Sequence, residues 1–144
     1  MSLYQHIMLA VDFGKDVGLL VEKAVQRARC EQAKLSAIHI EHTVGKPYHG
    51  MFDINLEKAN VAVEQSSIKT MKSLLENCGY PVDCYSHCCD DMAMTLTEAV
   101  KKYEVDLLLM GHHRYSWLGE ILASASEPVV RQMPCDILLI KTDL

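Results

Sequence analysis

The sequence predicts an α/β protein in which one parallel sheet carries helices on both of its faces. Five short apolar runs recur along the chain, and segments with the 3.6-residue spacing of amphipathic helices separate them. Alternation of strand and helix through the whole chain builds right-handed βαβ units, and these give a parallel sheet with helices on both faces. At 144 residues, we expect a single domain over residues 1–144 with a core of its own.

The five apolar runs are the predicted strands. The turn signal Gly79-Tyr80-Pro81 introduces the third run, which is the weakest of the five. The first, fourth and fifth runs are the most continuously apolar, and we expect these strands to be the most central or the best covered. The predicted strands are Ile7–Val11, Leu35–Ile40, Val82–Ser86, Asp106–Met110 and Asp136–Ile140.

Four predicted helices lie between these strands, each with one apolar face. Asp16 and Asp91 precede the first and third of them and are the expected N-terminal caps or first-turn acids. The segment from His42 to about Asn55 breaks the pattern, and its length indicates a long connecting loop. The apolar faces of the helices run from Val17 to Ala28, from Ile68 to Cys78, from Leu96 to Tyr103 and from Ile121 to Val130.

Charge and hydropathy exclude several classes of function. The net charge of −5 and the pI near 5.8 argue against a nucleic-acid-binding surface, which needs clustered Lys and Arg. No apolar run reaches the roughly 18 residues of a membrane span. The first residues lack the charged and apolar regions of a signal peptide, so we expect a cytoplasmic protein.

The ends of two predicted strands indicate a ligand crevice. Asp12 follows the first strand, and the fourth strand runs into Gly111 and then into a polar loop that contains Arg114. Ligands of open α/β sheets bind at the carboxyl ends of the strands. About a dozen residues later, Ser124 lies at the start of a predicted helix whose N-terminal amides suit an anion. We therefore predict a nucleotide or anion crevice here.

The sequence lacks the motifs of the common catalytic sites. It has no Gly-x-Ser-x-Gly elbow, no Gly-x4-Gly-Lys-Ser/Thr loop and no His-x3-His pair on a helix. These absences predict a protein that is not an enzyme and holds no metal. Cys84, Cys88 and Cys89 cluster with C-x3-C-C spacing, which predicts partly buried thiols at a strand end. A soft-metal or redox site to which His87, Asp90 and Asp91 add ligands is the alternative interpretation.

Four segments, taken together and in this order, resemble the universal stress protein family from end to end. The Gly-His-His that begins at Gly111 is similar to the universal stress protein A type. The segments are Ile7–Asp12, Leu35–Ile40, Asp106–His113 and Pro134–Ile140.

The resemblance implies an adenine nucleotide alpha hydrolase-like fold, a three-layer doubly wound sandwich around a five-stranded parallel sheet of order 3-2-1-4-5. It implies a homodimer that pairs through the last strand, Asp136–Ile140, which forms an apolar edge needing cover. It further implies a cytoplasmic stress-response factor that acts through protein partners or abundance rather than turnover.

ATP-binding members of this family carry Gly-x2-Gly-x9-Gly-Ser/Thr after the fourth strand. Gly111 matches the first glycine and Ser124 the Ser/Thr, but Arg114 and Ala123 replace the other two glycines, and the span is one residue shorter. Arginine adds bulk and disfavours a positive φ. We therefore predict that the chain does not hold ATP.

The alternative function is an ATP-binding switch, with or without slow hydrolysis. In that interpretation Asp12 lies near the ribose or a metal, and the backbone near Ile38 borders the base. The amides of Gly111 and Ser124 then hold phosphates, and Arg114 pairs with one of them.

Overall fold

The computed structural model describes residues 2–43, 56–112 and 132–142. The predicted helix from Ile121 to Val130 and most of the predicted loop from His42 to Asn55 lie outside these residues. The elements are β1 (His6–Ala10), α1 (Val17–Glu31), β2 (Lys34–His42), α2 (Leu56–Leu75), β3 (Val82–Cys89), α3 (Met92–Lys102), β4 (Leu107–His112) and β5 (Asp136–Lys141).

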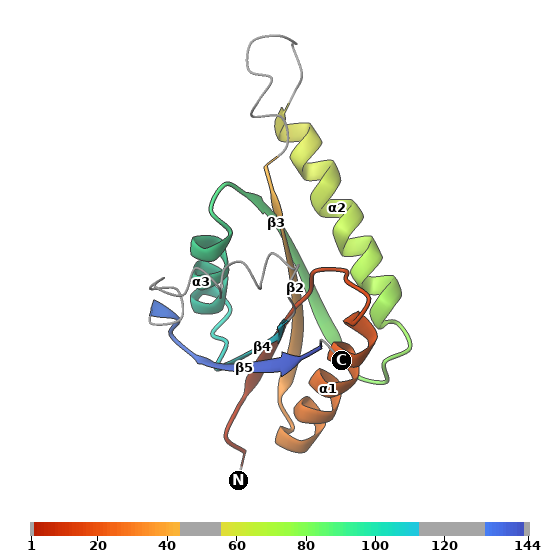
Figure 1. The fold of residues 1–144 in the computed structure, drawn as a ribbon, viewed down its shortest axis with the longest axis vertical. Coiled ribbons are helices and arrows are strands. Elements are labelled where there is room, and N and C mark those ends of the chain that lie inside the picture. The colour runs from red at the N-terminus through yellow and green to blue at the C-terminus, as the bar shows by residue number, and fades with distance from the viewer. Residues whose placement is uncertain (1, 44–55, 113–131, 143–144) are drawn as a thin grey trace.

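The five strands form one parallel sheet in the order β3-β2-β1-β4-β5, so the predicted fold class and strand order are confirmed. Helices α1 and α2 lie against one face of the sheet and α3 lies against the other (Figure 1). The chain leaves β1 towards β2 and later returns to the other side of β1 with β4. The topological switch point therefore lies between β1 and β4.

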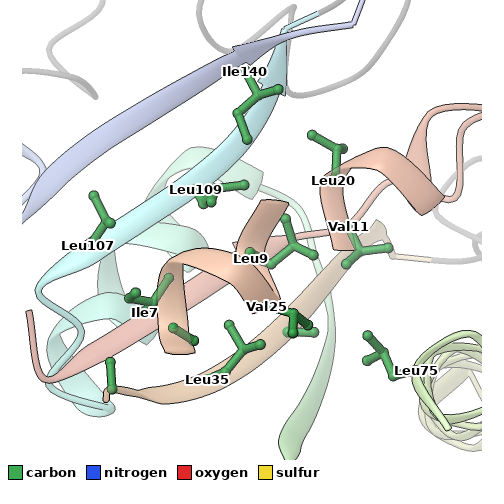
Figure 2. Packing of buried hydrophobic residues seen from close by; sticks show 14 of the residues in the cluster. Ile7, Leu9, Val11, Leu20, Val25, Leu35, Leu75, Leu107, Leu109 and Ile140 are labelled. Atoms are coloured by element: carbon green, nitrogen blue, oxygen red, sulfur yellow. The ribbon is translucent and has the colours of Figure 1, made fainter. Parts of the chain in front are cut away.

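Side-chain alternation along β1 divides the core into two clusters. Ile7 and Leu9 point towards α1 and α2, whereas Met8 and Ala10 point towards α3, and none of the four is more than 2% exposed. Figure 2 shows the first cluster, in which β1, β2 and β4 contribute Leu9, Leu35 and Leu109. Burying a side chain of this size stabilises the fold by about 1.5–3 kcal/mol.

Two of the expectations about the strands were wrong. The fourth strand does not end before Gly111, because Gly111 and His112 pair with Ile140 and Lys141 of β5. The fifth strand is not well covered: it lies at the edge of the sheet, and Leu138 and Leu139 are 39% and 46% exposed. An apolar run reads the same in a sequence whether the chain itself covers it or not.

The helix starts differ in how they are capped. The Asp91 carboxylate accepts a hydrogen bond from the Met94 amide at 3.0 Å, so the predicted cap of α3 is confirmed. Asp16 occupies the equivalent position of α1, but its side chain makes no capping hydrogen bond. None of the helices within the described residues is long and apolar enough to cross a membrane.

A buried histidine joins β1 to two other elements. His6 is 6% exposed; its Nδ1 donates to the Tyr103 carbonyl at 2.8 Å, and its Nε2 lies 2.8 Å from the Ser36 hydroxyl. The serine hydroxyl donates to Nε2, so a neutral ring satisfies both contacts. Burial lowers the pKa of His6.

The lowered pKa of His6 predicts a loss of stability in acid. The unfolded chain takes up a proton at the ordinary histidine pKa of about 6.5, whereas folded His6 takes it up only at lower pH. This contribution to the free energy of unfolding is complete above the ordinary pKa and is lost as the pH falls towards the lowered one. Urea unfolding at a series of pH values measures it.

The matched variant for this experiment is His6→Gln, since the amide keeps a donor and an acceptor but does not titrate. The chain has 7 histidines, so the difference between the two pH profiles isolates the contribution of His6. We expect a flatter profile for the variant between about pH 7 and pH 5. Identical slopes would contradict a neutral, buried His6.

Candidate functional site

Three of the five predicted site residues, Asp12, Ile38 and Gly111, lie near the carboxyl ends of the strands. Ala10, the last residue of β1, is in register with Ile38 of β2 and with Met110 of β4. Asp12 comes two residues after Ala10 and Gly111 one residue after Met110, so the two residues lie on neighbouring strands on either side of the switch point. Arg114 and Ser124 lie outside the described residues, so the complete crevice remains a prediction.

Gly111 lies where α1 comes closest to β4. A Cβ atom at this position would lie 2.8 Å from Cδ1 and 3.3 Å from Cδ2 of Leu20, which is itself 4% exposed. Both distances are shorter than an ordinary carbon–carbon contact. A side chain at this position would therefore force Leu20 to shift in the packing of α1 on the sheet.

The backbone groups at the end of β1 are bonded to β2. The Val11 amide donates to the Ile38 carbonyl at 2.8 Å. The Val11 carbonyl accepts a hydrogen bond from Nδ1 of His39 at 2.6 Å. The end of β1 is thus tied to β2 by the chain's own groups.

Beyond Val11 the chain makes a tight turn. The Asp12 carboxylate accepts a hydrogen bond from the Gly14 amide at 3.1 Å, as in an Asx-turn. Phe13 between them has φ = 57°, a left-handed conformation that costs a residue with a side chain about 1–2 kcal/mol. Its ring packs on His39, with ring centroids 4.3 Å apart.

His39, which the sequence analysis missed, is a polar residue that lies beside the predicted crevice. It is 3% exposed, and its Nε2 lies 2.7 Å from a carboxylate oxygen of Glu41. Both ring nitrogens thus face oxygen atoms that accept hydrogen bonds. The signal was available, because the strand places this polar residue in the same inward phase as Leu35 and Ala37.

More polar groups lie beside His39 on the neighbouring strand. Ser86 is its register partner on β3, and the buried Ser86 hydroxyl has no hydrogen-bond partner among the described residues. The Cys88 amide donates to the Glu64 carboxylate of α2 at 2.8 Å. The Cys88–Glu64 hydrogen bond attaches β3 to α2.

The cysteines of β3 do not converge on one site. Cys84 packs in the cluster beneath α1 and α2, and the Cys88 thiol donates to the Asn60 carbonyl of α2, whereas Cys89 packs on the α3 side. Burial raises the pKa of all three thiols, which disfavours the thiolate that binds metal. In residues 2–43, 56–112 and 132–142, no group of three His, Cys, Asp or Glu side chains is placed to hold a metal ion.

Comparison with known proteins places nearly the whole chain in one family. A model described as the universal stress protein family matches residues 3–141. Universal stress protein A of Yersinia pestis is 34% identical over 95% of this chain and 91% of its own length. Universal stress protein A of Escherichia coli K12 is 33% identical over 95% of this chain and 94% of its own length.

Solved structures share the fold at lower identity. Universal stress protein UspA from Lactobacillus plantarum superposes with a TM-score of 0.69 at 18% identity, covering 97% of this chain and 99% of that one. A universal stress protein solved in complex with cAMP superposes with a TM-score of 0.65 at 19% identity, covering 99% of this chain and 100% of that one.

The contact between Gly111 and Leu20 predicts a coupled pair of substitutions. Gly111→Ala should lower the free energy of unfolding by about 1–3 kcal/mol, because the new methyl group overlaps Leu20. Leu20→Ala alone should cost about 2–5 kcal/mol through the cavity that it leaves. The double variant should cost less than both together, with a coupling of about 0.5–3 kcal/mol measured by denaturant unfolding. Additive costs would show that the two side chains do not meet.

Proposed function

Because the chain belongs to the universal stress protein family, we propose that it is a homodimeric, non-enzymatic stress-response protein of the universal stress protein A type that acts in the cytoplasm and does not hold ATP. The similarity to two universal stress proteins A over 95% of the chain supports the assignment to this type.

The observation that carries the absence of ATP binding is the use of the switch-point groups for packing. Gly111 makes room for Leu20, and the Ile38 and Val11 carbonyls accept hydrogen bonds from the chain itself. In the sequence, Arg114 and Ala123 replace two glycines that ATP-binding members carry. A phosphate chain therefore finds less room and fewer glycine amides here.

The edge strand supports the homodimer. Leu138 and Leu139 of β5 are more than a third exposed, on a strand whose outer backbone groups face away from β4. A long apolar edge is a template for pairing with another strand. A second copy of β5 in antiparallel orientation covers both leucines and pairs these backbone groups.

A nucleotide-binding switch is the second candidate, and the neighbour solved with cAMP favours it. That protein has the same fold and binds an adenine nucleotide. In this chain the nucleotide would use Asp12, the backbone at Ile38, Gly111, Arg114 and Ser124.

A thermal-shift experiment separates the two candidates. Purified protein should show the same unfolding midpoint with and without saturating Mg-ATP, AMP or cAMP, and native mass spectrometry should find no retained nucleotide. A ligand at 100 times its Kd would add about 2.7 kcal/mol and raise the midpoint by several degrees. Such a rise with one nucleotide per chain would establish the switch instead.

A charge on the edge strand tests the dimer. Leu138 shares a hollow with Lys23, Arg27 and Lys141, so Leu138→Lys adds a fourth like charge there and places a lysine against the second copy. We expect the variant to sediment as a folded monomer at a concentration where the unchanged protein is a dimer. Val61→Lys is the control, because Val61 is 45% exposed on α2, away from β5. A dimer that survives Leu138→Lys would exclude pairing through β5.

A further inference from the structure

We propose that a groove between α1 and the C-terminal end of α2 binds a small amphiphilic carboxylate, with the carboxylate at Arg29 and the hydrocarbon chain along the valines of α1. The groove has a volume of about 450 Å³. Ligand pockets in proteins fall in the range of about 300–1,000 Å³. The groove extends to the turn before β3. It therefore reaches the amino ends of the strands, whereas the switch-point crevice lies at their carboxyl ends.

Apolar side chains form much of the groove wall, beside the polar side chains of Glu22, Gln26, Arg29 and Asn77. Val17, Val21 and Val25 form a stripe along α1, since residues four positions apart share one face of a helix. Leu74 and Cys78 form the facing wall at the end of α2. Leu74 is 44% exposed, so the groove offers apolar surface that an occupant would remove from water.

One end of the groove is closed by a cation. Nη2 of Arg29 donates to the Gly79 carbonyl at 2.6 Å, which joins the last turn of α1 to the turn before β3. Gly79 has φ = 78°, and a Cβ there would lie 2.7 Å from Nη2, so a glycine permits this contact. The bond uses one of several guanidinium donors, and the others suit a carboxylate. Asn77 adds an amide at the same end.

The other end is open. Among the described residues, a Cβ atom on Gly18 would meet nothing within 4 Å, and we take this open space at the start of α1 as the mouth of the groove. Glu22 lies on the wall between this mouth and Arg29. Its negative charge disfavours a carboxylate halfway along the groove. The charges therefore orient an amphiphile with its anionic head at Arg29 and its tail towards Gly18.

Titration with decanoate below its micelle concentration tests the proposal. We expect saturable binding of one decanoate per chain by calorimetry, with amide NMR shifts along α1 and at residues 74–79. Gly18→Leu places a side chain in the mouth and should weaken binding by about tenfold or more. Gly18→Ala is the matched control, because both variants remove the same helix glycine and only leucine fills the mouth. The control should bind as the unchanged protein does.

The head group is tested with a second pair of variants. Arg29→Gln should weaken the binding of decanoate but not that of decanol, whereas Lys23→Gln, which removes a cation of α1 outside the groove, should change neither. Absence of saturable binding, equal binding to Gly18→Leu and Gly18→Ala, or shifts confined to β5 would overturn the proposal. Equal loss of decanoate and decanol in Arg29→Gln would overturn the placement of the carboxylate.

Discussion

β1 is buried on both faces and paired on both edges, and the positions of the other elements follow from it. All five of its residues are buried, with alternate side chains in the two core clusters. Such a strand needs a neighbour on each side and a helix layer above and below. β2 and β4 are the neighbours. Helices α1 and α2 form one layer, and α3 forms the other. Where β1 ends, Val11 is bonded to β2, and Leu20 of α1 packs on Gly111 of β4.

At that place packing uses the atoms that the predicted phosphate site would need. A phosphate needs backbone amides without side chains above them, and a helix that packs closely on a strand needs the same free space. In this chain Leu20 occupies the space above Gly111, while His39 and Phe13 occupy the end of β1. Gly111 matches a glycine of the ligand loop in ATP-binding family members, and in this chain it also makes room for Leu20.

The sequence predicts much of the fold because apolar runs and helical spacing are local signals. The strands and the doubly wound topology follow from them and from the family resemblance, and Asp91 is recognisable as a cap. The candidate site is harder to predict. A glycine at the end of a strand looks the same whether it begins a loop or faces a leucine, as Gly111 does. The strand spacing places His39 in the inward phase, but its hydrogen bonds to Val11 and Glu41 become visible only in the fold.

The pairing of β1 with β4 also determines how the chain can fold. His6 and Asp106, which bond to each other at the start of these strands, are 100 positions apart. β1 can pair with β2 early in synthesis, but its other edge stays bare until β4 has been made. Pairings of such long range slow folding, and a bare apolar edge in a partly made sheet invites contact with other chains. The central strand that stabilises the finished protein thus exposes an unpaired edge, which favours aggregation, while the chain is being translated.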